Sequence, residues 1–229
     1  LHRNDWEVRQ ARLELQERQA AGTDITAALP ALRTMVENND DETRKLRALW
    51  TLWATNAIDD AFLTTQLGHR SEHVRAWSVQ LLCEDRDPPA AALEKFASLA
   101  EKDESPLVRL HLCSALQRIA PANRWPIVEA LAKHEKDATD QNLPLMLWYG
   151  TEPLVKNDLA GFVSLTKNTA IPLVRNHIAR RAAAEAGGIA EIVKALGDSP
   201  DSSPHDVFAG LFDGREGRRS APMPPAWPE

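Results

Sequence analysis

The sequence predicts an all-α protein, a HEAT-like (armadillo-like) α-α superhelix, or solenoid, of about six helix pairs. Three observations predict this fold class. A short phrase ending in Val-Arg or Leu-Arg recurs ahead of apolar helical runs, helix-capping residues precede most of these phrases, and no useful run alternates between apolar and polar residues. Because one such repeat cannot bury its apolar face alone, consecutive repeats are expected to stack around a shared interior.

The recurrence is marked by five arginines, which are Arg9, Arg47, Arg75, Arg109 and Arg175. They are separated by 38, 28, 34 and 66 residues, and Pro144 divides the last step into 35 and 31. A period of about 33 residues is typical of helical solenoids, which commonly hold another molecule along their surface. The period therefore favours binding or scaffolding over chemistry.

The second helix of each pair is predicted to begin at a cap such as Asp5, Ser71, Ser105 or Asp140, or near Pro106 or Pro172. These helices are expected at 5–20, 41–56, 71–83, 105–119, 140–151 and 171–186. The first helices are expected at 25–37, 59–68, 87–102, 123–135, 158–167 and 188–197. The apolar spacing within 87–102 is that of a helix with one buried stripe.

Residues 1–198 are expected to form the repeats, and residues 199–229 a loop, a short helix near 206–214 and a proline-rich tail. The chain opens at a second helix, so we expect a truncated first repeat and a segment of a longer protein. Trp6, Val8 and Leu13 would then be uncovered, which predicts an exposed apolar patch and a weak homodimer through this end.

The composition limits the classes of partner that the chain is expected to bind. Hydrophobic residues make up 43% and charged residues 26%, as in ordinary soluble domains. The net charge is −6, which disfavours wrapping of nucleic acid or of an anionic membrane. No stretch approaches the roughly 20 apolar residues of a membrane helix, so no membrane insertion is expected.

The recurring arginines are interpreted as a structural ladder. Asp41 and Asp103 each lie six positions ahead of an arginine, Arg47 and Arg109 respectively, and are expected to supply its carboxylate partner. A partly buried guanidinium bonded to a carboxylate and to carbonyls would fix one repeat against the next.

The sequence shows no chemical machinery. No phosphate-binding loop, nucleophile elbow or paired-carboxylate motif is present, so we expect no catalytic residue and no enzyme activity in this segment. Cys83 and Cys113 fit no metal or redox spacing and are expected to be buried free thiols. His69 and His73 are four apart, but Ser71 between them is a helix cap, so no metal site is expected.

Two groups of residues remain as candidates for contact with a partner. The first is the cationic concentration formed by Arg175, Arg180 and Arg181. The second is Trp227, in the tail, because most other tryptophans are expected to fill the interior. The alternative to a scaffold is a HEAT-like nucleic-acid-binding enzyme, such as a DNA glycosylase, that would act through these arginines.

Several phrases together resemble one family. They are the opening phrase 1–12, Leu46–Leu52, Glu72–Trp77, Asn142–Tyr149 and the Pro-Met-Pro tail within 218–228. These phrases look like the helical middle of the large PVC-type haem-binding CxxCH proteins, which are also described as membrane-bound dehydrogenases. The resemblance covers nearly the whole chain.

The resemblance implies a bacterial, extracytoplasmic (periplasmic) parent protein. In that family a propeller similar to sugar dehydrogenases precedes the helical repeats, and a c-type cytochrome domain with a Cys-x-x-Cys-His motif follows them. Cys83 and Cys113 do not match that motif, so haem c is expected elsewhere in the parent and no cofactor in this segment. The implied partners are the neighbouring domains of the parent chain or another protein.

Overall fold

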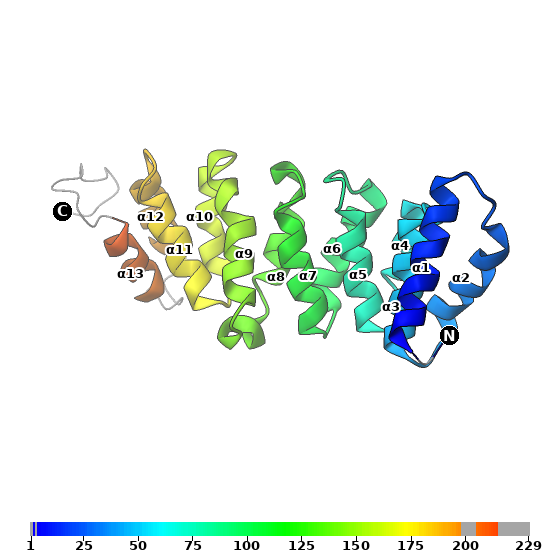
Figure 1. The fold of residues 1–229 in the computed structure, drawn as a ribbon. Helices are drawn as coiled ribbons and strands as arrows, with labels where there is room; N and C mark the ends of the chain where they lie inside the picture. The colour runs from blue at the N-terminus through cyan, green and yellow to red at the C-terminus, as the bar shows by residue number, and fades with distance from the viewer. Residues whose placement is uncertain (1, 3, 198–204, 215–229) are drawn as a thin grey trace, which may run out of the picture. The chain divides into compact units, whose positions relative to one another are not determined.

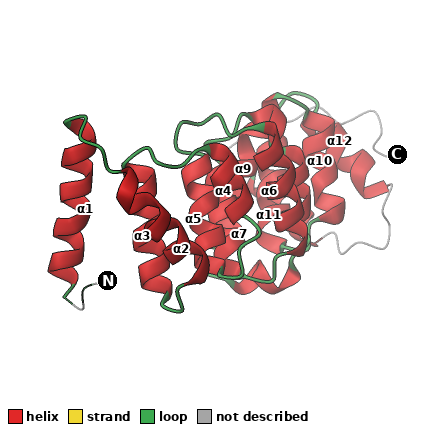
Figure 2. Ribbon diagram, turned by 90° about the vertical axis from the view of Figure 1, so that its right-hand side faces the viewer, coloured by secondary structure: helices red, strands yellow, loops and turns green. Residues whose placement is uncertain are grey.

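The computed structural model describes residues 2, 4–197 and 205–214, and every regular element within those ranges is a helix (Figure 2). The prediction of an all-α protein is confirmed. The chain divides into two compact units, residues 1–95 and 96–229, which are described separately.

The helices begin close to where caps and prolines placed them. In the first unit they are α1 (Asp5–Ala20), α2 (Leu29–Asn38), α3 (Glu42–Ala54), α4 (Asp60–Gln66) and α5 (Glu72–Leu82). The helix α6 (Ala90–Lys102) spans the division between the units. The second unit holds α7 (Pro106–Leu116), α8 (Trp125–Leu131), α9 (Leu143–Thr151), α10 (Leu159–Asn168), α11 (Pro172–Ala182), α12 (Gly188–Gly197) and α13 (His205–Asp213).

Side-chain oxygens cap several of these helices, as the sequence predicted. Ser71 and Ser105 accept from the N–H groups of Val74 and Val108, at 3.5 and 3.3 Å. The cap of α1 differs from the expectation, because Asn4 rather than Asp5 accepts from the Trp6 N–H at 3.0 Å. Each such bond satisfies one of the backbone donors that a helix start leaves unpaired.

Two helices that were predicted as the first of a pair, α2 and α8, are shorter than predicted. A 3₁₀ turn at Thr26–Ala28 delays the start of α2 to Leu29. Another 3₁₀ turn at Pro121–Asn123 precedes α8, which ends at Leu131 rather than near residue 135. At α2 the tight turn replaces the first residues of a helix that periodicity alone made continuous.

In the first unit, α3 packs against α1, α2 and α5, and α4 packs against α5. The interior is apolar and includes the fully buried Leu49, Leu52 and Val79. Between α3 and α5, the rings of Trp50 and Trp77 meet edge to face with centroids 4.8 Å apart. The tryptophans here fill space between helices, which is the role predicted for most of them.

In the second unit, α7, α9, α11 and α13 lie side by side in that order (Figure 1). The intervening helices α8 and α10 pack against α9 and α11 respectively, and α12 packs against α10 and α11. Glycine permits the closest approaches: a Cβ at Gly150 of α9 would lie 2.5 Å from the Leu116 Cβ, and one at Gly210 of α13 would meet the Asn176 carbonyl. Successive helices therefore pack nearly backbone to backbone.

Candidate functional site

The most complete of the arginine contacts is made by Arg109 of α7. Its side chain is buried, with 5% of the residue exposed, and its Nε and Nη2 donate to the two carboxylate oxygens of Asp137, both at 2.6 Å. Its Nη1 donates to the carbonyl of Asp103 at 2.8 Å. The contact with Asp137 is bidentate, and its hydrogen bonds raise the pKa of Arg109.

The carboxylate partner of Arg109 differs from the expected one. Asp103 offers Arg109 its backbone carbonyl, while its side-chain Oδ1 accepts from the Ser105 N–H at 3.0 Å. The carboxylate that grips Arg109 comes from Asp137, 28 residues further along the chain. The side chain six positions ahead is taken up by the turn that starts α7, so the loop presents a carbonyl instead.

The same arrangement recurs at Arg175 of α11. Its Nη1 donates to the carbonyl of Thr169, six residues earlier, at 2.6 Å, and its Nη2 donates to Asp206, 31 residues later, at 2.5 Å. Arg75 of α5 likewise donates to the carbonyl six residues before it, that of His69, at 2.9 Å. We call this contact the arginine clasp: a guanidinium that holds its own preceding loop and, at Arg109 and Arg175, a carboxylate about one repeat later.

Among the residues that the structure describes, the first two arginines of the series form no clasp of this kind. Arg9 pairs with Asp5 one helical turn earlier, at the surface, and Arg47 of α3 pairs with the same Asp5. Asp41, the expected partner of Arg47, instead caps α3 by accepting from the Thr43 N–H at 2.9 Å, and pairs with Arg44 at 3.5 Å. Capping fixes the Asp41 carboxylate over the first turn of α3.

The cationic concentration near residue 180 is largely neutralised. Arg175 pairs with Asp206, and Arg181 pairs with Glu152 and Glu185 at 2.6 Å each. Arg180 is exposed and makes no hydrogen bond or ion pair with the part of the chain that the structure describes. Trp227 and the tail lie outside the described residues. A nucleic-acid enzyme would need several unpaired cations here, so this pairing gives that alternative little support.

A buried polar cluster at the start of α5 was not predictable from the sequence. Lys45 is only 2% exposed and donates to Glu42 at 2.8 Å, and the Ser71 hydroxyl donates to the other oxygen of Glu42. The Ser71 N–H donates to His69 Nδ1 at 2.9 Å. Burial lowers the pKa of His69, and the positive charge of Lys45 lowers it further. The cluster ties α3 to the loop before α5.

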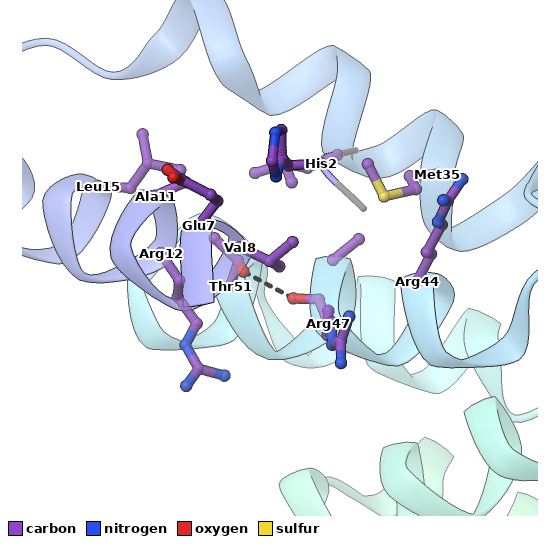
Figure 3. Close-up of a pocket in the computed structure, with 12 residues that line it drawn as sticks. His2, Glu7, Val8, Ala11, Arg12, Leu15, Met35, Arg44, Arg47 and Thr51 are labelled. Carbon is purple, nitrogen blue, oxygen red and sulfur yellow. Dashed lines mark hydrogen bonds between the residues drawn. The ribbon is translucent and has the colours of Figure 1, made fainter. Parts of the chain in front are cut away.

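The first unit also contains a hollow between α1, α2 and α3 (Figure 3). Its volume is about 140 Å³, and its apolar wall consists of Val8, Ala11, Leu15, Leu32, Met35 and Ala48. A second hollow of about 320 Å³ adjoins it. Its lining residues are Asp5, Val8, Arg9, Arg12, Thr43, Arg47, Trp50 and Thr51. These hollows were missed from sequence, although the Val8, Ala11 and Leu15 spacing marks one face of a helix.

Helix α1 forms one wall of both hollows and is little buried itself. None of its residues is buried, and Trp6 and Leu13 are 60% and 46% exposed. Exposure at this end was expected from the sequence, and the structure places Val8 between the two hollows rather than in an open patch.

Other chemical features are few in the described ranges. No cluster of three or more His, Cys, Asp or Glu side chains there is arranged to hold a metal ion. Cys83 and Cys113 are both buried and are not joined in a disulfide, and burial raises the pKa of Cys113. No helix in those ranges combines the length and the apolar character needed to cross a bilayer.

Comparison of the chain with protein-family models, with curated proteins and with solved structures finds no match.

Proposed function

We propose that the chain is a non-catalytic, HEAT-like helical-repeat scaffold whose surface positions neighbouring domains or a protein partner. The observation that carries the proposal is the arginine clasp. In the second unit it occurs at Arg109 and again at Arg175, each time six residues after a bonded carbonyl and 28 or 31 residues before a bonded carboxylate. A contact repeated at the period of the sequence is what a superhelix of like repeats requires.

In this proposal the clasp fixes the position of one repeat relative to the next and adds little net stability. A buried ion pair regains little beyond the cost of removing both charges from water, whereas loss of one partner leaves an uncompensated charge. Misregistered stacking of repeats would cause that loss, so the clasps penalise any packing except the native one. A framework with fixed repeat geometry is suited to holding two partners at a set separation.

The identity of the partners follows from the resemblance. In this proposal the segment spaces a sugar-dehydrogenase-like propeller from a c-type cytochrome domain in an extracytoplasmic bacterial protein. Haem would be attached to the cytochrome domain, and this segment would contribute shape and surface while the neighbouring domains carry out the oxidation.

Small-angle X-ray scattering of the 229-residue chain tests the scaffold. A compact protein of this length has a radius of gyration of about 17 Å, and an extended superhelix exceeds that value clearly. Titration calorimetry with the separately produced propeller and cytochrome domains of the parent then tests the partners. Saturable binding of either domain supports the proposal. A radius near the compact value, or oxidation of sugars by the chain alone, would overturn it.

A further inference from the structure

The paired hollows beside α1 have the form of a ligand site. The smaller hollow has an apolar wall from three helices, and its volume of about 140 Å³ is close to that of engineered apolar cavities that bind benzene. It has room for one apolar group about the size of a phenyl ring. Glu7 lies at its rim, so a negative charge is disfavoured on that side.

The larger hollow is rich in hydrogen-bond donors. Three guanidiniums line it, those of Arg9, Arg12 and Arg47, against the single carboxylate of Asp5. Asp5 pairs with Arg9 at 2.9 Å and also with Arg47, which leaves the wall with a positive excess. The Thr43 side chain and the Trp50 indole complete the wall.

Two of these donors have no partner among the residues that the structure describes. Arg12 makes no hydrogen bond or ion pair with the described residues, although it is half-buried between the two hollows. The Trp50 Nε1 is buried and has no hydrogen-bond acceptor among the described residues. Donors left without partners in a partly dry site lose free energy that an acceptor could restore.

The two hollows are continuous in their lining. Val8, Arg12, Arg47 and Thr51 belong to both, so the apolar space and the donor-rich space adjoin through this shared wall. In Figure 3 the Arg12 and Arg47 side chains extend away from His2, and both residues also line the larger hollow.

We propose that this site binds a small amphipathic organic anion, a carboxylate joined to an apolar body about the size of a phenyl ring. The apolar body occupies the space between Leu15, Met35 and Ala48. The carboxylate accepts from Arg12 and faces the positive excess of the larger hollow. Because α1 buries no residue of its own, a ligand that bridges α1 to α2 and α3 also fixes this helix in place.

Titration calorimetry of the 229-residue chain with phenylpropionate tests the site, with the neutral phenylpropanol as the matched ligand. We expect saturable binding of phenylpropionate below about 10 mM and binding about tenfold weaker for the alcohol, since a charge-assisted hydrogen bond to Arg12 is lost. Arg12→Gln is expected to weaken phenylpropionate about tenfold and to leave phenylpropanol unchanged. Ala11→Phe, which fills the apolar hollow from an exposed position, is expected to weaken both ligands.

Arg18→Gln is the matched control, because Arg18 is on the same helix, pairs with Glu14 and lines neither hollow. Its affinity should stay within about twofold of the unmodified chain. Circular dichroism of every variant checks that α1 remains helical. Absence of saturation by phenylpropionate, equal affinity for the alcohol, or an equal loss in Arg12→Gln and Arg18→Gln would each overturn the proposal. None of these outcomes bears on the scaffold function, which scattering and domain binding test separately.

Discussion

Replacing Asp137 with asparagine removes the charge from the most buried arginine clasp and keeps the shape of the side chain. Asp137 is 4% exposed and Arg109 is 5% exposed, so water cannot take the place of the missing carboxylate. Breaking a buried pair from one side costs about 3–5 kcal/mol. We expect Asp137→Asn to lower the free energy of unfolding by about that amount, since Arg109 keeps its charge, loses the opposing charge and faces an NH2 group in place of one of the two oxygens that accept from it at 2.6 Å.

The double variant Arg109→Met, Asp137→Leu removes the ion pair together with the cost of burying its two charges. With both charges gone, apolar packing is expected to recover most of the loss. The Asp103 carbonyl then lacks its donor, which leaves a residual destabilisation of about 1–3 kcal/mol. The double variant should therefore be more stable than Asp137→Asn.

Urea unfolding at pH 7, followed by circular dichroism, measures these differences. Glu14→Gln is the control, because the Glu14 and Arg18 pair is more than half exposed and is expected to contribute less than about 1 kcal/mol. The reasoning would be refuted if Asp137→Asn cost less than about 1 kcal/mol, or if the double variant were as unstable as the single one.

Three further predictions concern single positions. The lowered pKa of His69 means that the unfolded chain binds its proton more readily, so the stability from neutral His69 is present above pH ~6.5 and declines as the pH falls below it. Unfolding measured between about pH 8 and about pH 5 should show a weaker decline of stability in His69→Gln than in the unmodified chain; equal slopes would contradict this. Gly150→Ala would place a Cβ 2.5 Å from the Leu116 Cβ and is expected to cost about 1–3 kcal/mol, whereas Gly197→Ala meets nothing and should be neutral or slightly stabilising in thermal unfolding; equal effects would argue against close packing of α9. Cys113 is expected to resist a thiol reagent until the chain unfolds, because burial both covers the thiol and raises its pKa; rapid labelling of the native chain would refute this.

The helices were predictable because the signals that start them are local. Ser71, Ser105 and Pro172 stand beside the backbone groups that they cap or replace, so their effect is readable from neighbouring residues. The exceptions are also local. A 3₁₀ turn at Thr26–Ala28 replaces the predicted start of α2, and Pro121 opens the turn before α8.

The candidate sites were less predictable. Arg109 was singled out from its period, but Asp137 was not, because the acidic residues in the following loop are equivalent in sequence and only one meets the guanidinium. Lys45 reads as a surface residue beside Arg44, and only the packing of α3 against the loop before α5 buries it with Glu42. The proposed parent, with its propeller and cytochrome, rests on the sequence phrases alone.

The sequence by itself determined the helices and their order, and it marked five recurring arginines of which Arg75, Arg109 and Arg175 form clasps, because periodicity and capping act between residues within a few positions of one another. The tertiary structure alone decided which carboxylate meets each guanidinium, which cations stay unpaired and where the hollows beside α1 lie. Those outcomes depend on the directions and separations of helices that are distant along the chain, and side-chain packing sets both.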